Sequence, residues 1–269
     1  VPKTIDNDLA VTDHTPGYGS AAKYIASTMK EIIRDALVQP IKIVNIIEIM
    51  GRNAGWLTAA AALAKGDDCE GADLIYLPET VFDINKFVAK VQEIQKTKKQ
   101  IVVAVSEGVK TADGKYVCES ASSNMLVDSF GHKQLSGTAT ALANVISNEI
   151  GCKTRAIEFS TIQRCASHIA SLTDVNEAFI VGGIAVKAAF DGETGKVGIF
   201  QRLSNKPYLM GTSIYDVNAI ANVEKTVPQE WIINDGTGVS QEALDYMRPL
   251  IQGEIYPYMV DGLPRHIKL

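Results

Sequence analysis

The segment VPKTIDNDLAVTDH, residues 1–14, gathers a cation, a hydroxyl and two carboxylates within a few positions. Asp6 and Asp8 stand two apart, so in an extended segment both carboxylates point to one face beside Thr4. Carboxylates placed in this way bind a metal ion or divide into a base and a stabiliser of charge. Lys3 would supply a cation for a phosphate. The alternative is an Asx-type turn, because Asp and Asn favour turns, and on this stretch alone we prefer it.

Two more polar segments each follow a buried strand. In EIMGRNAGW, Gly51 lets the backbone approach a ligand and Arg52 is suited to hold an anion. In VSEG, Glu107 occupies the same topological position. The carboxyl ends of strands are where open α/β sheets bind ligands. The alternatives are a helix-entry turn with a surface arginine, and a solvated loop glutamate.

The stretch TRAIEFSTIQRC carries an arginine at each end, Arg155 and Arg164. Paired arginines recognise phosphate because the guanidinium fork matches its oxygens. Two surface charges would leave the same pattern, and we favour that interpretation if the segment is taken alone.

Strands and helices alternate along the chain. Apolar and β-branched runs predict strands at 41–49, 72–79, 100–108 and 152–160. Periodic patterns predict helices at 20–38, with Ser20 as N-cap, and at 53–66, 83–99, 137–151 and 173–192. A hairpin is predicted near DGETGK, with the returning strand at 197–202. The pattern is typical of an α/β protein with mostly parallel sheets.

Composition excludes several classes of protein. The 269 residues carry a net charge of −5, which argues against a nucleic-acid or acidic-membrane partner. The four cysteines are scattered, so we expect neither a zinc site nor a disulfide framework, and a cytoplasmic protein. No apolar run is long enough to span a bilayer, and no signal peptide is evident. Neither common nucleotide-binding glycine loop is present.

Taken in order, PKTIDNDLAVTDHTPGYGSAAKYI, EIMGRNAGWLTAAAALA, VSEG and STIQRCASHIASLTDVNEA resemble the 6-phosphofructokinases. The pattern is closest to the diphosphate-dependent branch and its near ATP-using relatives. The resemblance implies two Rossmann-like three-layer α/β/α domains with mostly parallel sheets. Residues 17–162 with 236–269 would bind fructose 6-phosphate. Residues 1–16 with 163–235 would be the remaining part of a phosphoryl-donor domain, incomplete because the family's donor loop and GGD segment lie before TIDND.

The resemblance also implies a role for each matching residue. Asp6 matches the base that takes the proton from the sugar 1-hydroxyl, and Asp8 an acid that positions Mg²⁺ or substrate. Thr4 matches a hydroxyl that contacts the substrate, and Glu107 matches a ligand of a sugar hydroxyl. The MGR element, Met50, Gly51 and Arg52, matches residues that hold fructose 6-phosphate, with Arg52 near the transferring phosphoryl group. Arg164 matches the arginine on the 6-phosphate, and Arg155 matches an arginine that reaches into the neighbouring subunit's site.

Lys3 bears on the donor. Diphosphate users keep lysine here and ATP-specific bacterial enzymes usually have glycine, although some ATP-using relatives also keep the lysine. Thr161 stands where those bacterial enzymes have histidine, and Ile43, beside Lys42, where they often have a cross-subunit arginine. These departures point away from the ATP-specific allosteric type, and an ATP-dependent enzyme remains the close alternative.

By resemblance we therefore expect Mg²⁺ as cofactor, fructose 6-phosphate and diphosphate or ATP as substrates, and a dimer or tetramer with shared sites. As an isolated piece the chain is expected to bind fructose 6-phosphate at most, without turnover. An alternative of another class is a non-catalytic regulatory subunit that binds sugar phosphate. Regulatory chains of the family often lose the acidic base, whereas Asp6, Asp8 and Arg52 are all present here.

Overall fold

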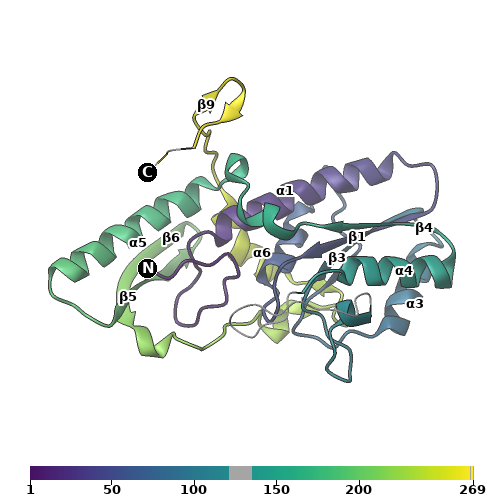
Figure 1. Ribbon diagram of the computed structural model, residues 1–269, viewed down its shortest axis with the longest axis horizontal. Helices are drawn as coiled ribbons and strands as arrows, with labels where there is room; N and C mark the ends of the chain where they lie inside the picture. Colours follow the sequence, from purple (N-terminus) through teal and green to yellow (C-terminus); the bar gives the residue numbers. More distant parts are fainter. Residues whose placement is uncertain (121–134, 267, 269) are drawn as a thin grey trace. The chain divides into compact units, whose positions relative to one another are not determined.

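The computed structural model describes residues 1–120, 135–266 and 268 and contains a sheet of four parallel strands (Figure 1). Its order is β2-β3-β1-β4, with bounds Leu74–Tyr76, Gln100–Ser106, Ile43–Ile49 and Lys153–Glu158. Every residue of β1 is buried, as its IVNIIEI sequence predicts for a strand covered on both faces. The predicted α/β class and parallel sheet are confirmed.

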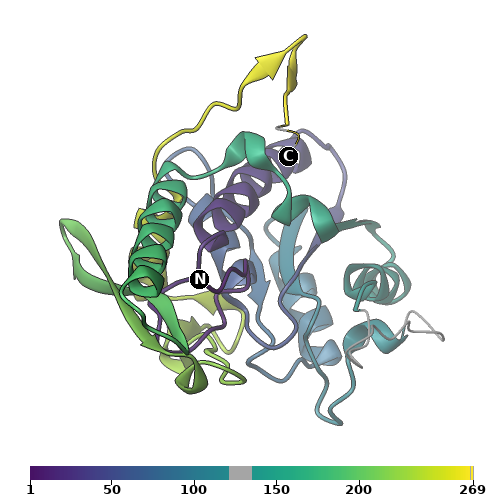
Figure 2. The ribbon, with the colours of Figure 1, turned by 60° about the vertical axis from the view of Figure 1, so that its left-hand side comes forward.

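Helices cover both faces of this sheet. Helix α1 (Tyr18–Leu37) lies along one face, and α3 (Ile84–Ile94) and α4 (Thr138–Ile150) along the other (Figures 1 and 2). Alternate β1 residues, Val44 and Ile46, belong to one buried apolar cluster with residues of α3 and α4. Because side chains alternate along a strand, the β1 residues between these two point to the opposite face, which α1 covers.

Helix α1 begins at Tyr18, so the prediction of Ser20 as its N-cap is wrong. The carboxylate of Asp174 takes the place of a local cap: it accepts hydrogen bonds from Gly17 N at 2.8 Å and Ser20 N at 3.1 Å, and from the Ser20 hydroxyl. An acid from a distant part of the chain satisfies the free N–H groups that a local cap usually satisfies.

The predicted single helix at 53–66 is also wrong. The segment forms a short α2 (Trp56–Ala59) followed by a 3₁₀ turn, η1 (Ala60–Ala64). Gly55 N donates to Glu79 Oε1 at 2.8 Å, which fixes the start of α2 by a long-range contact. The hydrogen bond from Gly55 to Glu79, and not helix propensity, therefore explains where this helix begins.

The hairpin was predicted in the wrong place. DGETGK connects α5 (Leu172–Phe190) to β5 (Lys196–Asn205), and β5 pairs antiparallel with β6 (Tyr208–Asp216). Gly192 and Gly195 have positive φ in that connection, which makes it look like a hairpin turn in the sequence. The true turn lies at 206–207.

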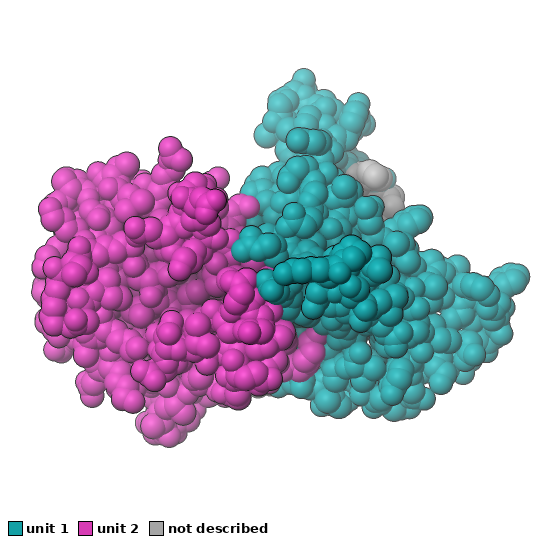
Figure 3. All heavy atoms as spheres, turned by 180° about the vertical axis from the view of Figure 1, so that it is seen from behind, with its two compact units in different colours: residues 1–24, 161–224, 245–269 teal, residues 25–160, 225–244 magenta. Residues whose placement is uncertain are grey.

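The chain divides into two compact units (Figure 3). Unit 1 comprises 1–24, 161–224 and 245–269, and unit 2 comprises 25–160 and 225–244. In the described residues of unit 1 the strand pairs are antiparallel, so a three-layer donor domain stays a prediction, as does the assignment of ligands to domains.

The remaining elements are short. They are η2 (Val117–Ser120), η3 (Ser160–Arg164), η4 (Ser167–Ile169), η5 (Val217–Ala219), η6 (Gln229–Trp231), β7 (Ile232–Ile233), β8 (Gly238–Val239), α6 (Gln241–Met247), η7 (Arg248–Ile251), β9 (Met259–Val260) and β10 (Leu263–Pro264).

A buried glutamate links β1 to α4 and makes stability depend on pH. Glu48 is 4% exposed and its Oε2 accepts from Ala139 N at 2.9 Å, in the first turn of α4. Burial, with a smaller contribution from Glu158, raises the pKa of Glu48 from 4.5 to about 7. Between these values the folded state binds a proton that the unfolded state has released. The free energy of unfolding is therefore expected to fall by about 3 kcal/mol as pH rises through that window.

The test is urea unfolding of the wild type and of Glu48→Gln at pH 4.5 and pH 7.5. The glutamine variant should lose this pH-dependent part of the stability. Glu149→Gln, on the exposed side of α4, should keep it. An unchanged pH dependence in Glu48→Gln would contradict the assignment.

Candidate active site

In unit 1, the TIDND segment is held by a compact set of hydrogen bonds. Thr4 Oγ1 donates to Asp6 Oδ2 at 3.1 Å and accepts from Asp6 N at the same distance. Thr4 O accepts from Thr15 Oγ1 at 2.7 Å. The Asp6 carboxylate is half-buried and oriented by the threonine two residues before it. A carboxylate held in this way is suited to accept a proton from a positioned hydroxyl.

The segment is turned and not extended, which corrects the premise that Asp6 and Asp8 share a face by alternation. Asn7 lies between them with φ 57° and is completely buried. Its Nδ2 donates to the Tyr246 hydroxyl at 3.0 Å. A non-glycine residue with left-handed backbone needs support from its surroundings, so Asn7 and its partner set the directions of both acids.

Lys3 and Arg164 line the same pocket within unit 1. The pocket has a volume of about 180 Å³, and its walls come from the TIDND segment, the start of α1, the 163–170 stretch and Asp174. Both cations are exposed side chains. Gly17, with φ 98°, lies so close to Lys3 that a Cβ there would stand 3.1 Å from Lys3 Cε. Two cations on one small pocket provide the charge that a phosphate group requires.

Asp174 was missed by the sequence analysis. It is buried, lines this pocket, and holds the first turn of α1 through Gly17 and Ser20. In the sequence it stands in TDVNEA as an acid in the first turn of a predicted helix, which is a common position for an acid. Nothing in the local pattern indicates a contact 157 residues away along the chain.

In unit 2, the MGR element and VSEG are brought together as predicted. Strands β1 and β3 are neighbours and end side by side, with Ile49 opposite Ser106. Gly51 N donates to Glu107 Oε1 at 3.3 Å, and Ser106 Oγ donates to Gly51 O at 2.5 Å. Gly51 has φ 141°, a conformation that glycine tolerates and other residues rarely adopt. The carboxyl edge of the sheet thus carries Met50, Gly51, Arg52 and Glu107.

Gly108 fits against the backbone of Arg52. A Cβ at Gly108 would stand 1.9 Å from Arg52 O and 2.6 Å from Arg52 C. Gly108 N donates to Ser106 Oγ at 3.1 Å, and the same oxygen donates to Gly51 O. The two loops are therefore packed so tightly that only glycine fits at position 108.

The two remaining predicted residues are not brought into these clusters. Arg155 lies in β4, where its Nη1 pairs with Asp35 Oδ2 at 3.0 Å; the two side chains are 41% and 60% exposed. Thr161 is exposed at the start of unit 1's second segment, and the pocket is lined by its neighbours Gln163 and Arg164. A role for Arg155 in a neighbouring subunit stays a prediction.

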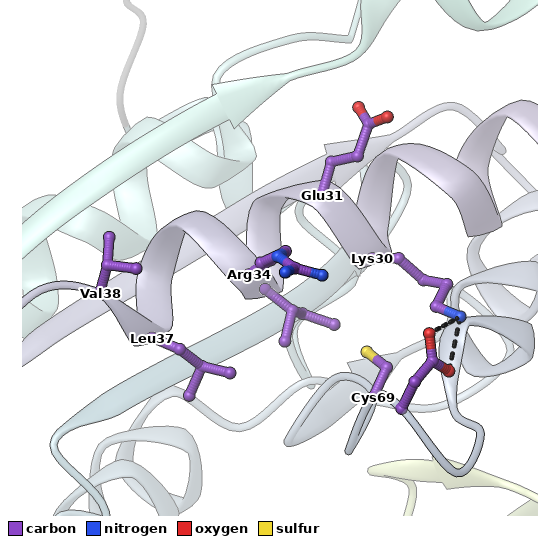
Figure 4. Close-up of a pocket in the computed structure, with 8 residues that line it drawn as sticks. Lys30, Glu31, Arg34, Leu37, Val38 and Cys69 are labelled. Atoms are coloured by element: carbon purple, nitrogen blue, oxygen red, sulfur yellow. Dashed lines mark hydrogen bonds and ion pairs between the residues drawn. The ribbon is translucent and has the colours of Figure 1, made fainter.

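A separate hollow of about 450 Å³ lies in unit 2 along α1, and none of the predicted site residues lines it (Figure 4). On its wall, Lys30 Nζ donates to both carboxylate oxygens of Asp68 at 2.8 Å. Lys30 is thus paired with an acid, and the hollow shares no lining residue with the pocket of Lys3 and Arg164.

Residues 1–120, 135–266 and 268 contain neither a membrane-spanning helix nor a cluster of metal ligands. None of their helices combines the length and apolar character that crossing a bilayer requires. No group of three or more His, Cys, Asp or Glu side chains is arranged to hold a metal ion there. Mg²⁺ is commonly held by one or two carboxylates together with substrate phosphates, and a single protein carboxylate such as Asp8 fits that mode.

The fold is that of an α/β protein with polar groups at the carboxyl edge of a parallel sheet in unit 2 and a small pocket in unit 1 that is lined by Lys3 and Arg164. The family model described as Phosphofructokinase matches residues 1–166, and the chain belongs to this family.

Similar proteins include the pyrophosphate–fructose 6-phosphate 1-phosphotransferases of Halomonas elongata, 40% identical over 271 positions, and Xanthomonas campestris pv. campestris, 42% identical over 272. Each alignment covers all of this chain and 64% of the relative. The crystal structure of a pyrophosphate-dependent phosphofructokinase from Nitrosospira multiformis matches 99% of this chain and 63% of its own, with TM-score 0.87 and 38% identity. The chain thus spans slightly less than two thirds of these relatives.

Proposed function

We propose that the protein takes part in phosphoryl transfer from diphosphate to the 1-hydroxyl of fructose 6-phosphate, which gives fructose 1,6-bisphosphate. The observation that carries the proposal is the pocket of unit 1, where Lys3 and Arg164 stand together next to the TIDND segment. The similar pyrophosphate-dependent phosphotransferases support the choice of substrates.

In this proposal Asp6 accepts the proton of the attacking hydroxyl, and the Thr4 hydroxyl keeps its carboxylate oriented. Arg164 binds the 6-phosphate from the wall of the pocket, and Lys3 stabilises charge on the transferring and leaving phosphates. Thr161 does not line the pocket, and its exposed hydroxyl would donate one hydrogen bond to the 6-phosphate. In unit 2, Met50, Gly51 and Arg52 contact the sugar phosphate, with Arg52 near the transferring group. The Glu107 carboxylate binds a sugar hydroxyl while also accepting from Gly51 N.

Mg²⁺ fits the same proposal as the partner of Asp8 and the diphosphate oxygens. When bound, it would neutralise phosphate charge during transfer. We further propose a homo-oligomer in which Arg155 serves a neighbouring subunit.

An ATP-dependent enzyme is the second candidate, and Lys3 disfavours it. The lysine contributes a compact cation at the phosphates themselves. A diphosphate donor has no nucleoside to bind, so its binding depends more strongly on such a contact to the phosphates.

The binding part of the proposal is tested by isothermal titration of the 269-residue chain with fructose 6-phosphate. Arg164→Ala is expected to weaken binding by roughly 10- to 100-fold, because it removes charge-assisted hydrogen bonds to phosphate. Arg248→Ala, an exposed arginine also in unit 1, should leave the affinity unchanged. Equal affinity of the wild type and Arg164→Ala would remove Arg164 from the site.

A further inference from the structure

A histidine is buried between two carboxylates in unit 1. His14 is 1% exposed; its Nδ1 lies 2.9 Å from Asp13 Oδ2 and its Nε2 lies 2.8 Å from Glu177 Oε2. A neutral imidazole carries one N–H, so only the imidazolium can donate to both carboxylates. In a neutral ring, one of the two nitrogens would present a lone pair, and not an N–H group, to its carboxylate. The two short contacts to carboxylates therefore favour the charged form of His14.

The charges around His14 balance. His14 contacts Asp13 from its own loop and Glu177 from α5. These acids are in turn contacted by Arg202 from β5, Tyr208 from β6 and Tyr246 from α6. Arg202 Nη2 lies 3.0 Å from Asp13 Oδ2, and the Tyr208 hydroxyl donates to Glu177 Oε1 at 2.8 Å. Two cations thus meet two carboxylates, and loss of the imidazolium proton would leave a buried net negative charge, which is unfavourable.

This cluster is connected to the TIDND segment. Tyr246 Oη donates to Asp13 O at 2.5 Å, and the same hydroxyl accepts from Asn7 Nδ2 at 3.0 Å. Asn7 is the left-handed residue between Asp6 and Asp8. The ring of His14 also stacks on Phe200 at 4.5 Å, which fixes the imidazole plane. Asp13 therefore connects His14, through its carboxylate, with Tyr246 and Asn7, through its backbone carbonyl.

We propose that the His14 imidazolium is a positioning residue for Asp6 and Asp8, acting through Asp13, Tyr246 and Asn7, so that the geometry of these acids depends on the charge of His14. The inference rests on the proposed function, in which Asp6 is the base.

The charge state is expected to change above neutral pH. Burial lowers the pKa of His14, but hydrogen bonds and charges from Asp13 and Glu177 outweigh burial, and the net direction is upward from 6.5. The stability that the ion pairs of His14 with Asp13 and Glu177 contribute is therefore complete below pH 6.5. It is lost as pH rises through the folded-state pKa of His14. Phosphoryl transfer should fall over the same range, since a displaced base loses efficiency steeply.

The test is NMR of the 269-residue chain with ¹⁵N-labelled histidine and backbone. The His14 ring should show imidazolium nitrogens at pH 6.5 and titrate above that value. The amides of Asn7 and Asp8 should shift with the same midpoint. In Glu177→Gln the midpoint should fall by about one unit or more. In His14→Gln the two amides should no longer titrate. His168→Gln, an exposed histidine, should change nothing.

An activity arm uses the protein expressed from its complete coding sequence. His14→Gln should lower kcat by roughly 10- to 100-fold, with KM for fructose 6-phosphate unchanged and the alkaline fall in kcat abolished. The inference would be overturned by a neutral His14 ring at pH 6.5. It would also be overturned if the amide chemical shifts of Asn7 and Asp8 did not change as His14 titrates. The wild-type titration decides this even if a variant fails to fold. A positive NMR result with no phosphoryl transfer would refute the proposed function and leave the positioning contact standing.

Discussion

Replacing Asp6 by Asn is expected to lower kcat by roughly 10²- to 10⁴-fold in the protein expressed from its complete coding sequence. Asn is nearly isosteric and can still accept the hydrogen bond of the Thr4 hydroxyl, so the TIDND segment keeps its local geometry. What is lost is the ability to accept a proton from the sugar hydroxyl. KM for fructose 6-phosphate is expected to change little, because other residues are proposed to contact the sugar.

The matched control is Asp191→Asn, which makes the same chemical change at an exposed acid that pairs with Lys187. It should leave kcat unchanged. Thermal unfolding of both variants shows whether any loss arises from stability. Unchanged turnover in Asp6→Asn would show that Asp6 is not the base.

Gly108→Ala is expected to disrupt the MGR element of unit 2. The added methyl group would stand 1.9 Å from Arg52 O, and the neighbouring atoms belong to the backbone, so no side chain can move aside. Overpacking of this kind costs about 1–3 kcal/mol. We expect a lower unfolding midpoint and at least tenfold weaker binding of fructose 6-phosphate, measured by thermal unfolding and isothermal titration of the 269-residue chain.

Gly182→Ala is the matched control. Gly182 lies within α5, and a Cβ there would meet nothing within 4 Å. Because alanine favours helix over glycine, this variant should be equally or more stable. Wild-type stability together with wild-type affinity in Gly108→Ala would show that the contact between Gly108 and Arg52 does not support the sugar site.

The sheet of unit 2 and its polar edge were predictable because local signals and topology agree there. A β-branched run such as Ile43–Ile49 identifies a strand buried on both faces, and parallel neighbours place their carboxyl ends together. From these two facts, Gly51 and Glu107 were expected at one edge, and the hydrogen bond between them confirms it.

The geometry around TIDND was not predictable, because contacts between distant positions decide it. Asn7 adopts a left-handed conformation supported by Tyr246, which lies 239 positions away along the chain. Asp13 pairs with Arg202 across 189 positions. The start of α1 cannot be inferred from neighbours in the sequence, since Asp174 of α5 accepts hydrogen bonds from its first turn. The second carboxylate at His14 likewise comes from α5, as Glu177.

The same reasoning explains the misplaced hairpin. A Gly-containing stretch between two regular elements satisfies the pattern for a turn whether it joins strand to strand or helix to strand. The pairing of β5 with β6, from Lys196 opposite Asp216 to Asn205 opposite Tyr208, shows that the hairpin turn lies after β5 and not before it.

The most direct test of the central claim measures product formation by the protein expressed from its complete coding sequence, given fructose 6-phosphate, Mg²⁺ and either diphosphate or ATP. We predict fructose 1,6-bisphosphate with diphosphate and none with ATP. Product with ATP and none with diphosphate would contradict the assignment of Lys3 and the proposed donor.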